Sequence, residues 1–340
     1  MLNLVTGATG LLGSHVLVEL TSRNQRVRAA YRNKEKITFV KALFDYYFGA
    51  LATDKWQNVD WVQADLLDID DLKSLIKGST HVYHCAALVS FFKADFESCI
   101  QQNRYVTAQL VDLSILNGVQ HFCHVSSTAA IGAKGLAINE NAKWLEGGQH
   151  SGYGISKRMA EKEVWRGIEE GLRAVIVNPC VILGPAAPLS PSLQMLDTAK
   201  NGLLFYTPGA NAVVDARDVA WAMAELVAKN IYNERFLVVG PNQTFKALFS
   251  AFANRLNKKA PRIAAPKFLA FALAAAHELW CHISKKRSGL SIETVRSAFE
   301  VHQYDCNKIQ KQLSFKHTPL ATIIENMITG QDFIEKNTKI

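Results

Sequence analysis

A tyrosine and a lysine stand four positions apart in the segment SGYGISKRMAEKE, residues 151–163. On a helix, Tyr153 and Lys157 lie one turn apart on the same face. A phenol with an ordinary pKa of about 10 is a poor base at neutral pH, and a nearby ammonium group favours its charged form. The two residues are therefore either a surface pair, which recurs by chance, or a proton-transfer pair.

A glycine-rich turn near the N-terminus could bind a pyrophosphate. The segment LNLVTGATGLLGSHVLVEL places its glycines directly after an expected strand and across the start of an expected helix. The first glycine allows the tight turn, the second lets the backbone approach a pyrophosphate, and the third permits close helix packing. The helix N-terminus then faces the anion. The expected contacts are Gly7, Thr9, Gly10, Leu11, Leu12 and Gly13.

The end of the second expected strand indicates which dinucleotide is preferred. Where an NAD site would carry an acid for the ribose 2′-hydroxyl, this chain has Tyr31, followed by Arg32 and Asn33. An acid would repel a 2′-phosphate, whereas an arginine binds one through charge-assisted hydrogen bonds. We therefore expect NADP(H) rather than NAD(H). The alternative is that Arg32 is a solvated loop residue.

The elements that must position these residues alternate along the first 180 residues. Apolar runs separated by helical stretches predict a parallel sheet covered on both faces, a doubly wound α/β (Rossmann) fold. The expected strands are Leu2–Thr6, Val27–Tyr31, Val59–Ala64, His81–Ala86, Phe122–Ser126 and Ala174–Val177. The expected helices are Leu11–Ser22, Leu67–Lys77, Asp95–Asn117 and Ser156–Glu170. The long connection after the second strand is rich in aromatic residues and is expected to form an amphipathic helix on the sheet.

Beyond residue 180 the alternation loosens, which predicts a smaller, mainly helical substrate-binding lobe. Helices are expected at Ala216–Lys229, Phe245–Leu256, Lys267–Ile283 and Ser291–Ala298. We assign residues 1–180 to the nucleotide-binding domain, with residues 213–240 returning to it. Residues 181–212 and 241–335 form the expected lobe.

Composition excludes several classes of function. The net charge of +8 is spread along the chain, with local clusters at Arg32–Lys36, Lys258–Lys259 and Lys285–Arg287. No zinc-finger spacing or RNA-binding aromatic motif is present, so nucleic acid is not an expected partner. The six cysteines are scattered, which fits a reducing, cytoplasmic compartment, and neither a secretory signal nor a metal site is expected.

The apolar segment at residues 267–287 is too short to span a bilayer and carries His277 and Glu278. A helix packed against the lobe is the favoured interpretation. The alternative is an interfacial helix with a basic end that contacts a membrane or admits a lipophilic substrate.

Several motifs together resemble the extended short-chain dehydrogenase/reductases, the NAD-dependent epimerase/dehydratase group. They are the spacing G-x-x-G-x-x-G, then HCAALVS, QNRYVTAQLVDLS, HVSSTAAIG, YGISK, VNPCVILGP and VVDARDVAWA, in the expected order. Within this group the chain looks nearest to the dihydroflavonol-4-reductase-like branch, with 3β-hydroxysteroid dehydrogenases as cousins.

The resemblance implies roles for individual residues. Tyr153 would be the proton donor or acceptor, Lys157 would hold the nicotinamide ribose, and Ser127 would orient the substrate oxygen, with Thr128 as its alternative. Asn103 and His124 are expected to be structural rather than catalytic. The further cofactor contacts implied are Asp65, Leu66, Ala86, Ala87, Leu88, Val125, Pro179 and Val181.

The expected reaction is reversible hydride transfer between NADP(H) and a carbonyl carbon of a small molecule. One alternative is a nucleotide-sugar epimerase or dehydratase using the same serine, tyrosine and lysine; the chain has Asn211 where sugar enzymes tend to carry an arginine. A remote alternative is a non-catalytic NADP-binding sensor. The resemblance also implies a homodimer formed by the 95–117 and 156–170 helices.

Overall fold

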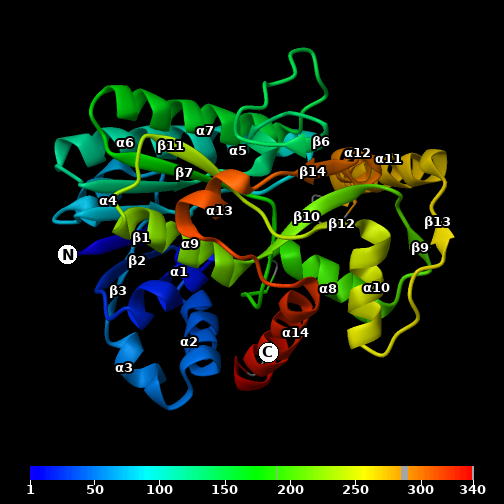
Figure 1. Ribbon diagram of the computed structural model, residues 1–340, viewed down its shortest axis with the longest axis horizontal. Coiled ribbons are helices and arrows are strands. Elements are labelled where there is room, and N and C mark those ends of the chain that lie inside the picture. Colours follow the sequence, from blue (N-terminus) through cyan, green and yellow to red (C-terminus); the bar gives the residue numbers. More distant parts are fainter. Residues whose placement is uncertain (189, 285–289, 339–340) are drawn as a thin grey trace.

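A parallel seven-stranded sheet forms the centre of the molecule in the computed structural model, which describes residues 1–188, 190–284 and 290–338 (Figure 1). Its strand order is β11-β7-β5-β4-β1-β2-β3. The strands are β1 (Asn3–Thr6), β2 (Val27–Tyr31), β3 (Val59–Gln63), β4 (His81–His84), β5 (His121–Val125), β7 (Ala174–Pro179) and β11 (Glu234–Val238). The strand order reverses between β1 and β4, and ligands of such sheets bind at the carboxyl ends of the strands beside that point. The doubly wound α/β prediction is confirmed.

Helices cover both faces of this sheet (Figure 1). One face packs against α1 (Leu11–Ser22), α2 (Lys36–Phe48), α3 (Ala52–Trp56) and α9 (Ala216–Ala228). The other face packs against α4 (Ile69–Ile76), α6 (Val106–Leu116) and α7 (Gly152–Glu169). Side chains alternate along each strand, so Val5 of β1 belongs to the first core and Leu4 to the second. This double burial explains why the strands are apolar throughout.

The long connection after β2 folds as α2, the short η1 (Gly49–Leu51) and α3, as the aromatic pattern predicts. Phe39 and Phe44 are buried, and the Phe44 ring packs edge-on against Trp56 with the centroids 5.1 Å apart. The expected Asp95–Asn117 helix is present without a gap, but its type changes along its length. It consists of η2 (Lys93–Asp95), α5 (Phe96–Cys99), a π-helical segment η3 (Ile100–Tyr105) and α6.

The small lobe mixes helices with short strands. A three-stranded sheet pairs β12 (Asn242–Thr244), β10 (Ala210–Asp215) and β8 (Val181–Leu183). Two further ribbons pair β13 (Ile263–Ala264) with β9 (Phe205–Tyr206) and β14 (His302–Tyr304) with β6 (Gly135–Ile138). The helices are α8 (Pro191–Asn201), α10 (Phe245–Arg255), α11 (Lys267–Ser284), α12 (Ile292–Phe299) and α14 (Leu320–Thr338). Leu189 and the basic cluster Lys285–Arg287 lie outside the described residues.

The chain crosses between the two parts more often than the sequence indicates. Residues 213–240 supply α9, which packs on α1, and β11, which pairs with β7. The short helix α13 (Asn307–Leu313) falls in the segment expected to belong to the lobe, yet it packs on β11. Its Ile309 is fully buried in the same core as Phe236.

The C-terminal helix α14 ties the lobe to the nucleotide-binding domain. Asn326 of α14 accepts a hydrogen bond from the Tyr47 hydroxyl (3.3 Å), and Thr329 is hydrogen-bonded to the Tyr46 hydroxyl (2.8 Å). Both tyrosines belong to α2, so α2 and α14 lie side by side (Figure 1). This contact fixes the end of the chain next to the first glycine turn.

Candidate active site

The glycine turn after β1 has the geometry that a pyrophosphate requires. Gly7 has a positive φ of 66°, and a Cβ atom there would lie 2.7 Å from the Ala86 backbone. A Cβ on Gly13 would overlap the Gly7 carbonyl oxygen. Helix α1 starts at Leu11 with no side chain capping its first N–H groups, so these donors and the helix dipole remain for an anion. The residues present therefore fit the diphosphate of a dinucleotide.

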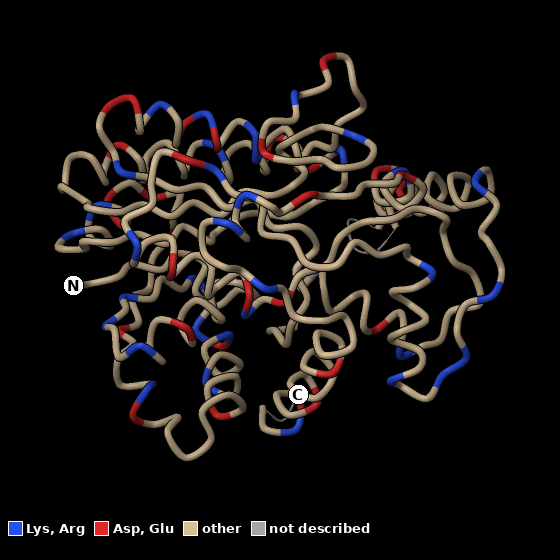
Figure 2. Tube along the Cα trace, viewed as in Figure 1, with Lys and Arg blue, Asp and Glu red and all other residues tan. Residues whose placement is uncertain are grey.

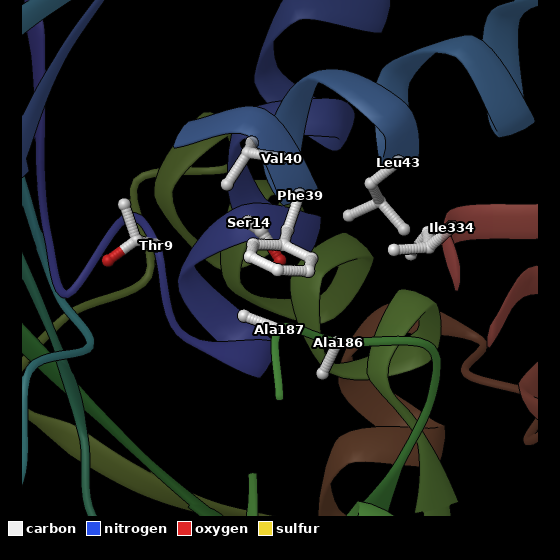
Figure 3. Close-up of a pocket in the computed structure, with 8 residues that line it drawn as sticks. All are labelled: Thr9, Ser14, Phe39, Val40, Leu43, Ala186, Ala187 and Ile334. Atoms are coloured by element: carbon white, nitrogen blue, oxygen red, sulfur yellow. The ribbon is translucent and has the colours of Figure 1, made fainter. Parts of the chain in front are cut away.

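A narrow hollow borders the outer side of this turn (Figure 3). Thr9 and Ser14 line it from the turn and α1, opposite Phe39 of α2 and Ile334 of α14. Its lining is mainly apolar, and it has no room for a water molecule. Helices α2 and α14 thus close the back of the phosphate turn.

Arg32 stands free at the end of β2. It is exposed, and it forms no ion pair or hydrogen bond with another described residue. The ring of Tyr31, one residue earlier, packs edge-on against Trp61 at 6.2 Å. Asp65 follows the neighbouring strand β3, and its carboxylate accepts a hydrogen bond from the Leu67 amide at 3.1 Å. An unpaired cation therefore lies at the end of β2, the position at which the sequence predicts a contact with a 2′-phosphate.

The other sequence-predicted cofactor residues gather along the carboxyl edge of the sheet. Each follows or ends a strand, on both sides of the point where the strand order reverses. They are Asp65 and Leu66 after β3, Ala86, Ala87 and Leu88 after β4, Val125 at the end of β5, and Pro179 and Val181 at the junction of β7 and β8.

Tyr153 lies in the first turn of α7, which begins at Gly152, four residues earlier than the start that the sequence indicates. Ser151 caps this helix by accepting a hydrogen bond from the Gly154 amide at 3.0 Å. Burial raises the pKa of Tyr153 to about 12, although a hydrogen bond with the Ser127 side chain lowers it in part. The ring of Phe91 packs edge-on against Tyr153 at 5.7 Å. At neutral pH the phenol therefore carries its proton.

Ser127 and Thr128 face different partners. The hydroxyl of Ser127 accepts a hydrogen bond from the Ala129 amide at 3.2 Å and also bonds Tyr153. The hydroxyl of Thr128 bonds Tyr304 of β14 instead. Of the two hydroxyls that the sequence leaves open, only the Ser127 hydroxyl contacts Tyr153.

Lys157 is a buried amine rather than a surface cation. Its side chain is 2% exposed, and its Nζ donates a 2.6 Å hydrogen bond to the Val125 carbonyl. Burial lowers the pKa of Lys157 to about 8, and the charge of Glu161 opposes this shift. The sequence predicts that Lys157 lowers the pKa of Tyr153. The structure differs, because burial dominates and both groups move toward their neutral forms.

Asn103 anchors the loop after β4. Its side-chain oxygen accepts a hydrogen bond from the Leu88 amide (2.8 Å), and its amide group donates to the Leu88 carbonyl (3.0 Å) and to the Ser156 hydroxyl (2.8 Å). The π-helical segment widens the helix at this position, a distortion that often marks functional sites. Asn103 thereby joins the segment Ala86–Leu88 to the helix that carries Tyr153 and Lys157.

Two buried histidines lie behind Lys157. His84 bonds Thr6 through Nδ1 (2.7 Å) and Thr107 through Nε2 (3.0 Å). His124 lies beside it, with the ring centroids 5.4 Å apart, and both of its ring nitrogens are buried without a hydrogen-bond partner. Burial holds both pKa values far below the ordinary range. His124 is thus a packed residue at the end of a strand, as the sequence indicates.

The structure also identifies residues that sequence reasoning missed. His84 was not singled out, although the pattern HVYH places it at the carboxyl end of β4 facing the same side as Thr6. Asn178, at the end of β7, donates a 2.9 Å hydrogen bond to the Ser127 carbonyl.

Comparison with known proteins agrees with this geometry. Residues 3–240 match the model of the NAD dependent epimerase/dehydratase family. Sterol demethylase protein B of Methylococcus capsulatus is 29% identical over 279 residues, which cover 81% of this chain and 80% of the relative. A Synechocystis protein with the provisional name dihydroflavonol 4-reductase is 23% identical, covering 95% of this chain and 92% of its own length.

Among solved structures, UDP-glucuronic acid 4-epimerase from Bacillus cereus, determined in complex with NAD, superimposes with a TM-score of 0.74. It is 18% identical, covering 99% of this chain and 97% of its own, so this likeness concerns the fold. The family match covers well over half of the chain. The chain belongs to the NAD-dependent epimerase/dehydratase family of extended short-chain dehydrogenases/reductases.

Proposed function

We propose that this protein is an NADP(H)-dependent reductase that interconverts a carbonyl compound and its alcohol. The observation that carries the proposal is the protonated phenol of Tyr153, hydrogen-bonded to Ser127 at the carboxyl edge of the sheet. A group that must donate a proton at neutral pH works best when it still holds that proton. The family and the relatives named as reductase and sterol demethylase support this class of chemistry.

In this proposal, separate residues bind the cofactor, orient it and transfer the proton. The amides of the glycine turn and the start of α1 bind the pyrophosphate, and Arg32 binds a ribose 2′-phosphate. When bound, the nicotinamide cofactor supplies the hydride equivalent. Lys157 orients the ribose hydroxyls, Ser127 stabilises negative charge that develops on the substrate oxygen, and Tyr153 protonates that oxygen.

The charges around β9 and β10 indicate the class of substrate. A nucleotide sugar needs cations to hold its diphosphate, and the segment Phe205–Asp215, with β9 and β10, contains no lysine or arginine. Asn211 uses its side-chain oxygen to accept a hydrogen bond from the Ala212 amide at 2.8 Å. The arginine that follows, Arg217, is bound to the buried carboxylate of Asp215. These features favour an uncharged substrate.

The second candidate function, a nucleotide-sugar epimerase, uses the same serine, tyrosine and lysine. It is favoured by the match to the epimerase/dehydratase model and by the fold shared with UDP-glucuronic acid 4-epimerase. Binding of UDP-sugars in calorimetry, together with sugar interconversion without net NADPH consumption, would decide for it.

The proposal is tested by replacing Tyr153 with phenylalanine. NADPH oxidation with a panel of ketones and aldehydes should fall by about 10²–10⁴-fold, the usual contribution of general acid catalysis. NADPH binding, followed by nucleotide fluorescence, should be retained. Tyr232→Phe is the matched control, because Tyr232 contacts His121 at the opposite end of β5. Full turnover by the Tyr153→Phe protein would exclude the proposed mechanism.

A further inference from the structure

Helix α11 carries an exposed apolar surface along its whole length. Phe268 is 78% exposed and Trp280 is 65% exposed, and the leucines between them are exposed as well. The large hydrophobic residues described as exposed on this helix are Phe268, Leu269, Leu273, Leu279, Trp280 and Ile283. Surfaces of this size and kind are unusual on a soluble protein and mark sites of interaction.

The exposed residues form one continuous stripe. With about 3.6 residues per turn, positions 268, 272, 279 and 283 fall within a narrow sector, and positions 269, 273 and 280 lie directly beside them. Ala272, Ala275 and Ala276 are exposed in the same sector, which contains no charged residue. The opposite side, with Ala274 and Cys281, is buried against the lobe. The stripe is therefore a complete apolar face without a partner in the described structure.

Positive charge surrounds the start of this helix. Between Glu234 and Glu278 the sequence contains no acidic residue. The connection from α10 to α11 is lined with basic side chains (Figure 2). These exposed residues, which form no ion pair with other described residues, are Lys258, Lys259, Arg262 and Lys267.

We propose that α11 and the basic connection before it form a docking surface for an anionic lipid bilayer. The apolar stripe would enter the boundary between headgroups and acyl chains, and the lysines and arginine would contact the acidic headgroups. Among the described helices, none has the length and hydropathy needed to traverse a bilayer, so α11 lies along the surface. A second copy of the chain would instead bring another positive surface against this one.

The docking surface lies close to the candidate active site. Glu278 of α11 accepts a hydrogen bond from the Ile292 amide at 2.8 Å, at the start of α12. The next residue of α12, Glu293, accepts a hydrogen bond from the Gly152 amide at 3.3 Å, directly before Tyr153. Docking would therefore hold the start of α7, which carries Tyr153, near the bilayer. The docking itself does not depend on the reductase assignment.

The experiment is vesicle co-sedimentation of the full-length protein. Vesicles of phosphatidylcholine alone are compared with vesicles that also contain phosphatidylglycerol, at low and at high salt. Partitioning onto the anionic vesicles should be at least about tenfold stronger and should weaken with salt. Trp280 is the one exposed tryptophan of six, so its emission should shift to shorter wavelength upon binding.

Two variants separate the two parts of the surface. Phe268→Ser with Leu273→Ser should reduce partitioning by about tenfold or more, since both side chains are exposed and their loss leaves the core intact. Lys258→Glu with Lys259→Glu keeps the apolar stripe and should remove the preference for anionic lipid. Leu116→Ser is the control, because Leu116 is 79% exposed at the end of α6.

Equal binding to neutral and anionic vesicles would overturn the proposal, as would no binding to either. Light scattering provides a further check at several protein concentrations. A dimer that the Phe268→Ser, Leu273→Ser protein no longer forms, together with no vesicle binding, would show that a second copy covers α11.

Discussion

The amine of Lys157 donates a 2.6 Å hydrogen bond to the Val125 carbonyl, which ends the strand leading to Ser127. Helix α7 and strand β5 are thereby joined at the point where the candidate catalytic groups stand. The contact takes Lys157 out of water, and burial lowers its pKa to about 8. The packing that positions Lys157 therefore also brings the pKa of its amine closer to neutral pH.

We predict that kcat/KM for carbonyl reduction falls above about pH 8. The pKa of Lys157 is lowered, so its charged form is complete below that pH and is lost as the pH rises. In the proposed mechanism, the charged amine is the form that holds the ribose and favours proton transfer from Tyr153. A pH–rate profile of the free enzyme's kcat/KM measures this limb.

Variants at position 157 test whether Lys157 causes the fall in kcat/KM above about pH 8. Lys157→Arg keeps a charge at all accessible pH values and should move the decline to higher pH. Lys157→Met should lower kcat/KM by at least about a hundredfold. A decline near pH 8 that persists in Lys157→Arg would show that another group controls it.

Ser127→Ala is expected to lower kcat by about 10²-fold, because in the proposed mechanism the Ser127 hydroxyl donates a hydrogen bond to the substrate oxygen. Thr128→Val is the matched control, since the Thr128 hydroxyl bonds Tyr304 rather than Tyr153. It should cost only about 1 kcal/mol of unfolding free energy and leave turnover near normal. Steady-state kinetics and denaturant unfolding of both proteins provide the comparison. Equal losses of kcat would contradict the distinction between these hydroxyls.

Arg32→Asp should weaken use of NADPH by about 10- to 100-fold in kcat/KM, because a charge-assisted contact with the 2′-phosphate becomes a repulsion. The value for NADH should stay constant or rise, since a carboxylate can bond the ribose 2′-hydroxyl. Arg26→Asp makes the same change in charge at the other end of β2, where Arg26 is exposed, and should alter neither value. If kcat/KM for NADPH were unchanged in Arg32→Asp, Arg32 would be a solvent-exposed residue without a role in cofactor binding.

Much of the nucleotide-binding domain could be predicted because local signals decide it. The positive φ of Gly7 and the close approach of Gly13 to the Gly7 carbonyl leave room only for glycine, so the turn is visible in the sequence. Strands buried on both faces appear as apolar runs.

The depth and partners of the site could not be predicted, because they depend on contacts between distant segments. Periodicity predicts a helix through Asn103 but does not reveal that the segment is π-helical. Nor does it reveal that Asn103 bonds Leu88 and Ser156. The burial of Lys157 depends on how α7 packs against β7 and on its hydrogen bond to Val125 of β5, segments that lie far apart in the sequence. The return of α13 to the sheet likewise rests on Ile309 fitting a core that no local pattern describes.

Buried histidines are expected to make the folded protein less stable in acid. Burial lowers the pKa of His15 and of His81 to about 4, and it also lowers those of His84 and His124. Because the unfolded chain takes up protons at these histidines near pH 6.5 and the folded protein does so only near pH 4 or below, acid favours unfolding. The free energy of unfolding is therefore highest above pH 6.5 and decreases as the pH falls toward 4. Each histidine adds up to about 1.4 kcal/mol per pH unit to the slope. Urea unfolding at a series of pH values measures it.

His84 and His124 allow a comparison within one layer of the core. His124→Phe removes a proton site whose ring nitrogens have no partner, so unfolding free energy at pH 7 should be maintained and the acid slope should decrease. His84→Phe breaks the bonds to Thr6 and Thr107 and should cost about 1–3 kcal/mol at pH 7. A greater loss of stability in His124→Phe than in His84→Phe would contradict this expectation. It would indicate that the ring nitrogens of the native His124 are hydrogen-bonded to a buried water molecule.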